Sequence, residues 1–140
     1  MKFIALLITF FSFSTAYAQD IEIEMLNKLG KERMVYSKKL VNINVGDKVK
    51  WKATDKTHNV AFIKGAIPEG VELFKSKVNK DTEYTFTTPG IYAYKCTPHY
   101  GMGMIGFVVV GDDLSNLEQV KAIKYPGKAK KLAKELLSAL

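Results

Sequence analysis

The chain has 140 residues and carries 21 basic against 14 acidic side chains, a formal net charge of +7 at pH 7. This length suits one domain with one sizeable core, and the single cysteine, Cys96, excludes an internal disulfide bond. The basic charge favours acidic partners, but the lysines are scattered between apolar segments, which argues against a nucleic-acid-binding patch.

The first eighteen residues are typical of a secretory signal peptide. Lys2 gives a charged start, residues 3–13 are almost wholly apolar, and Ala16-Tyr17-Ala18 has the small-x-small pattern of a cleavage site. An uncleaved membrane anchor is the alternative, but eleven helical residues rise only about 16 Å, roughly half of a bilayer's hydrocarbon core. We therefore expect export, cleavage after Ala18, and one mature domain over residues 19–140.

Most of the mature chain reads as short strands separated by turns. Apolar and polar residues alternate over residues 21–25, 41–45, 49–53 and 84–86, with Gly46-Asp47 as a turn. After a second turn at Pro89-Gly90, residues 91–96 resume as a strand with Tyr92 and Tyr94 on a common face. Residues 105–110 are uniformly apolar, which favours a central strand. The pattern predicts an all-β domain.

The spacing of apolar residues becomes helical over residues 114–140. Ser115 and Glu118 match a capping box, which predicts a short helix. A second, amphipathic helix follows, with these apolar residues on one face: Ala129, Leu132, Ala133, Leu136, Leu137 and Leu140. Such a basic helix either lies on an anionic membrane or covers a sheet of its own chain; we expect the second because its apolar face continues a compact domain.

Residues 96–104 bring together side chains that bind soft metals. Cys96, His99 and two methionines, Met102 and Met104, follow the end of a predicted strand, and His58 is the only other histidine. Singly, each residue is more often a core or surface side chain. Together they supply two imidazoles, one thiolate and a weak thioether, the set typical of blue-copper electron transfer. Either methionine fits as the axial ligand, because both have the same strand parity.

These motifs resemble those of the cupredoxins, and the resemblance covers essentially all of the mature chain. It is carried by segments 21–28, 55–60, 67–70, 74–77 and 95–100 and by the helical tail. The resemblance implies an eight-stranded Greek-key β-sandwich with two C-terminal helices packed on it. It also implies one copper ion cycling between Cu(II) and Cu(I), with Met104 as the axial ligand and Met102 beside the site.

The resemblance implies roles for residues around the ligands as well. The Asn59 backbone N–H would donate to the Cys96 sulfur, and its side chain would reach Thr97. Pro98 has no N–H and therefore cannot add a further donor to the sulfur. His99 would be the electron port. The surface around it that meets a partner would include Lys28, Met34, Lys56, Lys75, Lys95, Pro98 and Met102.

An acidic redox protein, such as a copper nitrite reductase or a periplasmic cytochrome, is the partner that the resemblance implies. The protein is then expected in the periplasm, as a monomer without stable membrane association. A copper storage or delivery protein is the alternative, but such proteins have easily opened sites. An enzyme is not expected, because residues 96–104 contain no carboxylate and the chain no third histidine for acid–base chemistry. Zinc would leave the thioether without a role.

Overall fold

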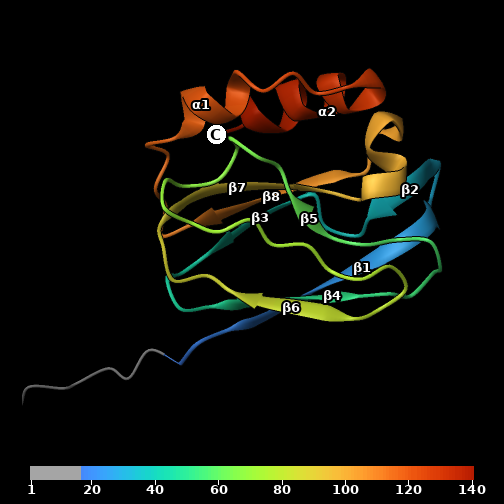
Figure 1. The fold of residues 1–140 in the computed structure, drawn as a ribbon, viewed down its shortest axis with the longest axis horizontal. Helices are drawn as coiled ribbons and strands as arrows, with labels where there is room; N and C mark the ends of the chain where they lie inside the picture. The colour runs from blue at the N-terminus through green and yellow to red at the C-terminus, as the bar shows by residue number, and fades with distance from the viewer. Residues whose placement is uncertain (1–16) are drawn as a thin grey trace, which may run out of the picture.

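The computed structural model describes residues 17–140, so the expected signal peptide lies almost entirely outside the described residues. The described part contains eight strands, one 3-10 helix and two α-helices (Figure 1). The strands are β1 (Asp20–Leu29), β2 (Glu32–Tyr36), β3 (Leu40–Ile43), β4 (Lys48–Lys52), β5 (Ala61–Phe62), β6 (Thr82–Thr85), β7 (Gly90–Lys95) and β8 (Ile105–Val110). The helices are η1 (Thr97–Met102), α1 (Leu117–Lys121) and α2 (Gly127–Leu137).

The strands form two four-stranded sheets that pack face to face. One sheet has the order β2-β1-β4-β6 and the other β3-β8-β7-β5. Alternating residues turn inward from both sheets, so Ile23, Trp51, Phe86, Tyr94 and Val108 meet in one buried cluster between them. The period-two alternation therefore predicted the strands, and the two facing sheets form the sandwich that the family resemblance implied.

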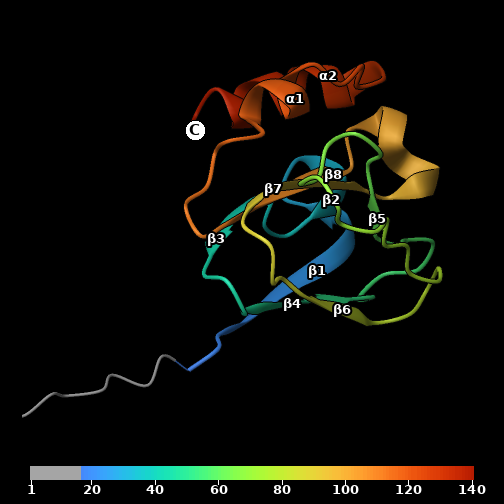
Figure 2. The same ribbon diagram turned by 60° about the vertical axis from the view of Figure 1, so that its left-hand side comes forward.

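The sheet that contains β8 is covered on both faces, which explains the lack of alternation in residues 105–110. Val108 and Val110 belong to the core between the sheets, whereas Phe107 and Val109 belong to a second core beneath the helices. The helices lie over this second face in both views (Figures 1 and 2). Ala129, Ala133 and Leu137 of α2 pack with Phe107 and Val109 in this second core, as the amphipathic pattern predicted. Among the described residues, no helix has the length and apolar character needed to span a membrane.

Tyr94 and Gly106 form a cross-strand pair in the centre of this sheet. The two residues lie directly opposite each other in the antiparallel β7–β8 pairing. A Cβ added to Gly106 would lie 2.4 Å from the Tyr94 ring, so the ring covers the bare backbone of the glycine. Aromatic cover of this kind compensates for a glycine within a strand.

The predicted capping box at Ser115 is wrong. Asn116, not Ser115, occupies the position before α1, and its side chain makes no cap hydrogen bond. Instead, the Asn116 side chain accepts a hydrogen bond from the Ile91 N–H at 2.9 Å and donates one to the Ile91 carbonyl, also at 2.9 Å. Asn116 therefore joins the start of α1 to β7 through a tertiary contact, which the local sequence does not reveal.

Candidate metal centre

Three backbone hydrogen bonds close residues 96–104, here called the ligand loop, into a compact turn. The Cys96 N–H donates to the Met104 carbonyl at 3.0 Å, and the Met104 N–H donates to the His99 carbonyl at 3.2 Å. Gly103 ends η1 in the left-handed conformation, with φ of +95°, and its N–H donates to the Tyr100 carbonyl at 3.1 Å. The loop thus brings its two ends, and with them Cys96 and Met104, side by side.

His58 reaches the same place from a separate loop before β5. Thr57 precedes it with φ of +74°, a costly conformation for a β-branched residue. Asn79 supports the turn from both sides, because its side-chain oxygen accepts from the Thr57 N–H and its own N–H donates to the His58 carbonyl at 3.0 Å. This support directs the His58 side chain inward, where it is fully buried.

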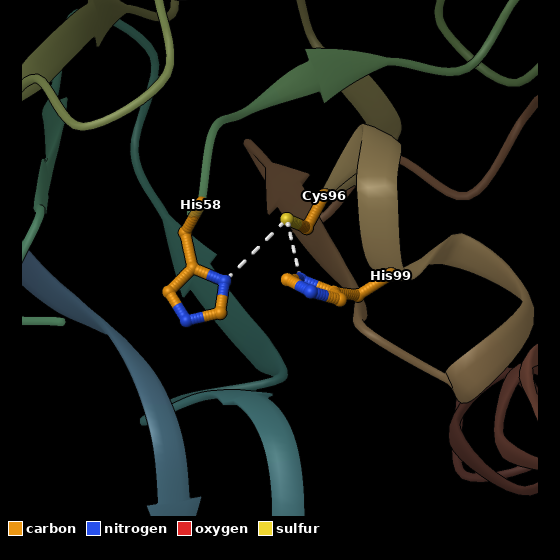
Figure 3. Close-up of side chains that lie close together, drawn as sticks. All are labelled: His58, Cys96 and His99. Atoms are coloured by element: carbon orange, nitrogen blue, oxygen red, sulfur yellow. Dashed lines mark hydrogen bonds between the residues drawn. The ribbon is translucent and has the colours of Figure 1, made fainter. Parts of the chain in front are cut away.

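The side chains of His58, Cys96 and His99 converge on one point (Figure 3). The Cys96 Sγ lies 3.6 Å from His58 Nδ1 and 3.4 Å from His99 Nδ1. One ligand atom from each residue lies within 4.8 Å of the other two, as binding to a common metal ion requires. Cys96 and His58 are fully buried, whereas His99 is partly exposed.

The two methionines of the ligand loop lie in opposite environments. Met104 has no exposed surface and packs in the same core cluster as Cys96. Met102 is 48% exposed. Met104 is therefore the methionine placed to complete a buried site, which the pattern of the sequence alone left open.

A hydrogen bond to Asn27 fixes the orientation of His58. The His58 Nε2–H donates to Asn27 Oδ1 at 2.9 Å, so the lone pair of Nδ1 is left to face Cys96. The Asn27 backbone N–H donates in turn to Asp55 Oδ2 at 2.6 Å. Sequence reasoning missed Asn27 as a site residue, because it lies in a strand 31 positions from His58 and belongs to no metal-binding motif.

Asn59 links the two loops that carry the ligands. Its Oδ1 accepts from the Thr97 N–H at 2.8 Å, and its Nδ2 donates to Thr97 Oγ1 at 3.2 Å. Its backbone N–H opposes the rise in the pKa of the Cys96 thiol. Its carbonyl accepts from the hydroxyl of Tyr36 at 2.8 Å. Asn59 and Thr97 thus meet as expected, and the buried Tyr36, which the sequence did not single out, ties β2 to the same network.

The protonation of the metal-free site follows from burial. Burial lowers the pKa of both His58 and His99, and the nearby His99 ring adds to the effect at His58. Burial raises the pKa of the Cys96 thiol, while the backbone N–H groups of Asn59 and His99 oppose that rise. Both imidazoles are therefore disposed to be neutral with a free lone pair, and metal binding must release the thiol proton.

The residues expected at a partner surface are divided between two depressions and open surface. Met34 and Met102 line a groove of about 560 Å³ bounded by β2, η1 and α2. Pro98 and Lys75 line a separate, shallow depression of about 580 Å³. Met34 and Pro98 therefore line different depressions, and their place in one apolar patch around His99 stays a prediction. Lys28 and Lys56 are exposed, and Lys95 is half-buried with its Nζ 4.5 Å from the centroid of the Tyr100 ring.

Comparisons with known proteins agree with this geometry. The family of copper binding proteins of the plastocyanin/azurin type matches residues 23–111. The pseudoazurin of Paracoccus pantotrophus is 48% identical over 114 residues, which cover 81% of this chain and 79% of that protein. The chain belongs to the pseudoazurins. The crystal structure of pseudoazurin from Methylobacterium extorquens AM1 superposes with a TM-score of 0.83 at 37% identity, covering 86% of this chain and 98% of that one.

A second pseudoazurin structure, from Sinorhizobium, gives a TM-score of 0.81 at 45% identity, covering 85% of this chain and 94% of that one. These findings confirm the cupredoxin fold and the copper cofactor that the sequence predicted. Pseudoazurins are electron carriers and not enzymes. In this chain, His58, Cys96, His99 and Met104 form the type 1 copper site. The donors fit copper, since thiolate and thioether suit Cu(I) and imidazole suits Cu(II).

Proposed function

We propose that this protein carries single electrons through the periplasm to an acidic reductase, most simply a copper nitrite reductase. The observation that carries this proposal is the difference in burial among the ligands. Cys96, His58 and Met104 have no exposed surface, and His99 alone reaches the solvent. Bound copper supplies the one-electron Cu(II)/Cu(I) couple, and the edge of the His99 ring is the port through which a docked partner exchanges the electron.

The surrounding residues would keep the site in one shape during this exchange. The hydrogen bond from His58 to Asn27 fixes one ring, and the contacts of Asn59 with Thr97 fix the ligand loop. A cage that is formed in advance needs little rearrangement when the charge changes. The Cys96 thiolate also lowers the net charge that the buried site must accommodate.

The basic side chains would bring the partner to this port. Lys28, Lys56 and Lys75 are exposed, and Lys95, at the end of β7, lies over the Tyr100 ring of the ligand loop. Positive charge around an apolar contact raises the rate of encounter with an acidic surface while dissociation stays fast. Cleavage of the expected signal peptide after Ala18 removes one charged residue, Lys2, and leaves a net charge of +6.

The visible spectrum of the copper-loaded protein tests the proposal. We expect an intense thiolate-to-Cu(II) band that bleaches on reduction and returns on oxidation. Cys96→Ser should abolish the band, Met104→Leu should alter it, and Met102→Leu should leave it intact. Absence of the band in the unmodified protein would contradict electron transfer through this site. Rapid loss of copper to a mild chelator would instead indicate copper delivery.

A further inference from the structure

The first turn of α2 packs on the ligand loop. α2 contacts η1 more extensively than it contacts α1 or β8. In both views η1 lies beside the end of α2 at which the helix begins (Figures 1 and 2). The C-terminal helix therefore does more than cover the sheet.

Two glycines allow this close approach. A Cβ added to Gly127, the first residue of α2, would lie 2.4 Å from the Gly101 carbonyl oxygen. A Cβ added to Gly103 would lie 3.4 Å from the Cβ of Lys128. Gly127 also has φ of +49°, a conformation that glycine adopts without steric cost. The turn thus approaches the ligand loop on both sides of Met102, with backbone facing backbone at Gly101 and the Lys128 Cβ facing Gly103.

Tyr100 anchors the middle of the ligand loop in the same place. It packs against the second core, the cluster beneath the helices that includes Ala129 and Ala133 of α2 and Tyr125. The loop lies outside the regular sheet pairing and contains Gly101 and Gly103, so its own backbone is permissive. Contacts from outside the loop therefore add to the backbone hydrogen bonds that close it.

We propose that the first turn of α2 is a clamp that positions the ligand loop, and that Gly127 is its central positioning residue. The loop carries both His99 and Met104, and the hydrogen bond from the Met104 N–H to the His99 carbonyl couples them. A displacement of Gly101 is passed to both ligands, because the loop is closed on itself. The helical tail then sets the placement of His99 and Met104 relative to Cys96.

Gly127→Ala tests the clamp, with Gly70→Ala as a matched control. Both glycines have positive φ, +49° and +79°, but a Cβ on Gly70 meets no atom within 4 Å. Both variants therefore carry backbone strain, and only Gly127→Ala forces Gly101 to move. In the copper-loaded protein we expect Gly127→Ala to change the ratio of the visible absorption bands and the reduction potential, and Gly70→Ala to change neither.

Amide exchange in the copper-free protein gives a second readout. The N–H groups of Gly103 and Met104 should exchange at least about tenfold faster in Gly127→Ala than in Gly70→Ala, because the loop opens locally more often. Pro126→Gly, which frees the entry to α2 without adding a side chain, should act in the same direction if Gly127→Ala fails to fold.

Equal spectra, potentials and exchange rates in the clamp and control variants would overturn the proposal, whatever happens to the melting temperature. The clamp rests on the copper site of the proposed function, but the exchange measurement needs no copper. Failure of the clamp is therefore distinguishable from failure of that function.

Discussion

His58 and His99 are ligands of the same type in different surroundings. His58 is fully buried and its Nε2 is held by Asn27, whereas His99 is partly exposed on a short helix. The first arrangement fixes a ligand and the second leaves a ring edge accessible. This difference supports the proposed roles, with His58 as the fixed ligand and His99 as the electron port.

Asn27→Ala should weaken copper binding about 10- to 100-fold, because His58 loses the partner that fixes its tautomer and ring orientation. A competition titration against a chelator, followed by the visible band, measures the change. Asn44→Ala is the control, since Asn44 is exposed in the turn between β3 and β4. Equal affinities for the two variants would show that Asn27 does not support the ligand.

Pro98→Ala should raise the reduction potential. The backbone N–H groups of Asn59 and His99 already oppose the rise in the pKa of the Cys96 thiol, and an alanine at position 98 would introduce a further N–H in the ligand loop. A new donor weakens thiolate donation and favours Cu(I); a bond of about 1 kcal/mol corresponds to an increase on the order of 50 mV. Voltammetry against Pro89→Ala, a proline in the turn before β7, measures the shift, and a lowered potential would refute the argument.

The ligands themselves were largely predictable from the sequence. Counting His58, Cys96 and His99 was sufficient, because the chain offers no other histidine or cysteine. Met104 needed the resemblance, and its burial then distinguished it from Met102. Asn27 and Tyr36 were not predicted, since hydrogen bonds between distant strands leave no local pattern in the sequence.

The strands and helices were predicted where one face meets a core. Period-two alternation located β1 and β4, and uniform apolarity located β8, because these patterns record burial directly. The start of α1 was misread for a different reason. Its local signal, Ser115, is exposed, while the neighbouring Asn116 is engaged with β7.

This contrast predicts the stability of two adjacent variants. Asn116→Ala should lower the free energy of unfolding by about 1–3 kcal/mol, because the buried backbone of Ile91 loses both side-chain partners. Ser115→Ala should change it by less than about 0.5 kcal/mol, as for most surface substitutions. Urea denaturation of the copper-free protein measures both. A larger loss of unfolding free energy in Ser115→Ala than in Asn116→Ala would contradict this argument and support a capping box at Ser115.

At the scale of the whole molecule, the effect of the placement of charge can be tested apart from the effect of its total. Lys56 and Lys75 are expected around the electron port, whereas Lys130 and Lys134 of α2 line a cavity of about 420 Å³ with Ile123 and Tyr125. The two pairs are equal in charge and differ in position. Comparing them separates local steering from a general effect of net charge.

Lys56→Gln with Lys75→Gln should slow electron transfer to an acidic copper nitrite reductase by about tenfold at low salt and flatten its dependence on ionic strength. The double variant Lys130→Gln with Lys134→Gln should react nearly as fast as the unmodified protein. Stopped-flow kinetics over a series of salt concentrations measures both. Equal slowing by the two pairs, or no dependence on salt in the unmodified protein, would exclude docking through the expected lysines.

The pair formed by Tyr94 and Gly106 constrains how this protein can evolve. The Tyr94 ring fills the space that a side chain at position 106 would occupy, so a methyl group there displaces the ring. Loss of the ring alone leaves a cavity, which costs about 3–5 kcal/mol for a large aromatic side chain. A substitution at either position alone therefore destabilises the fold. Among related chains, residue size at position 94 should therefore vary inversely with residue size at position 106, a covariation that the fold imposes two residues away from Cys96 and from Met104.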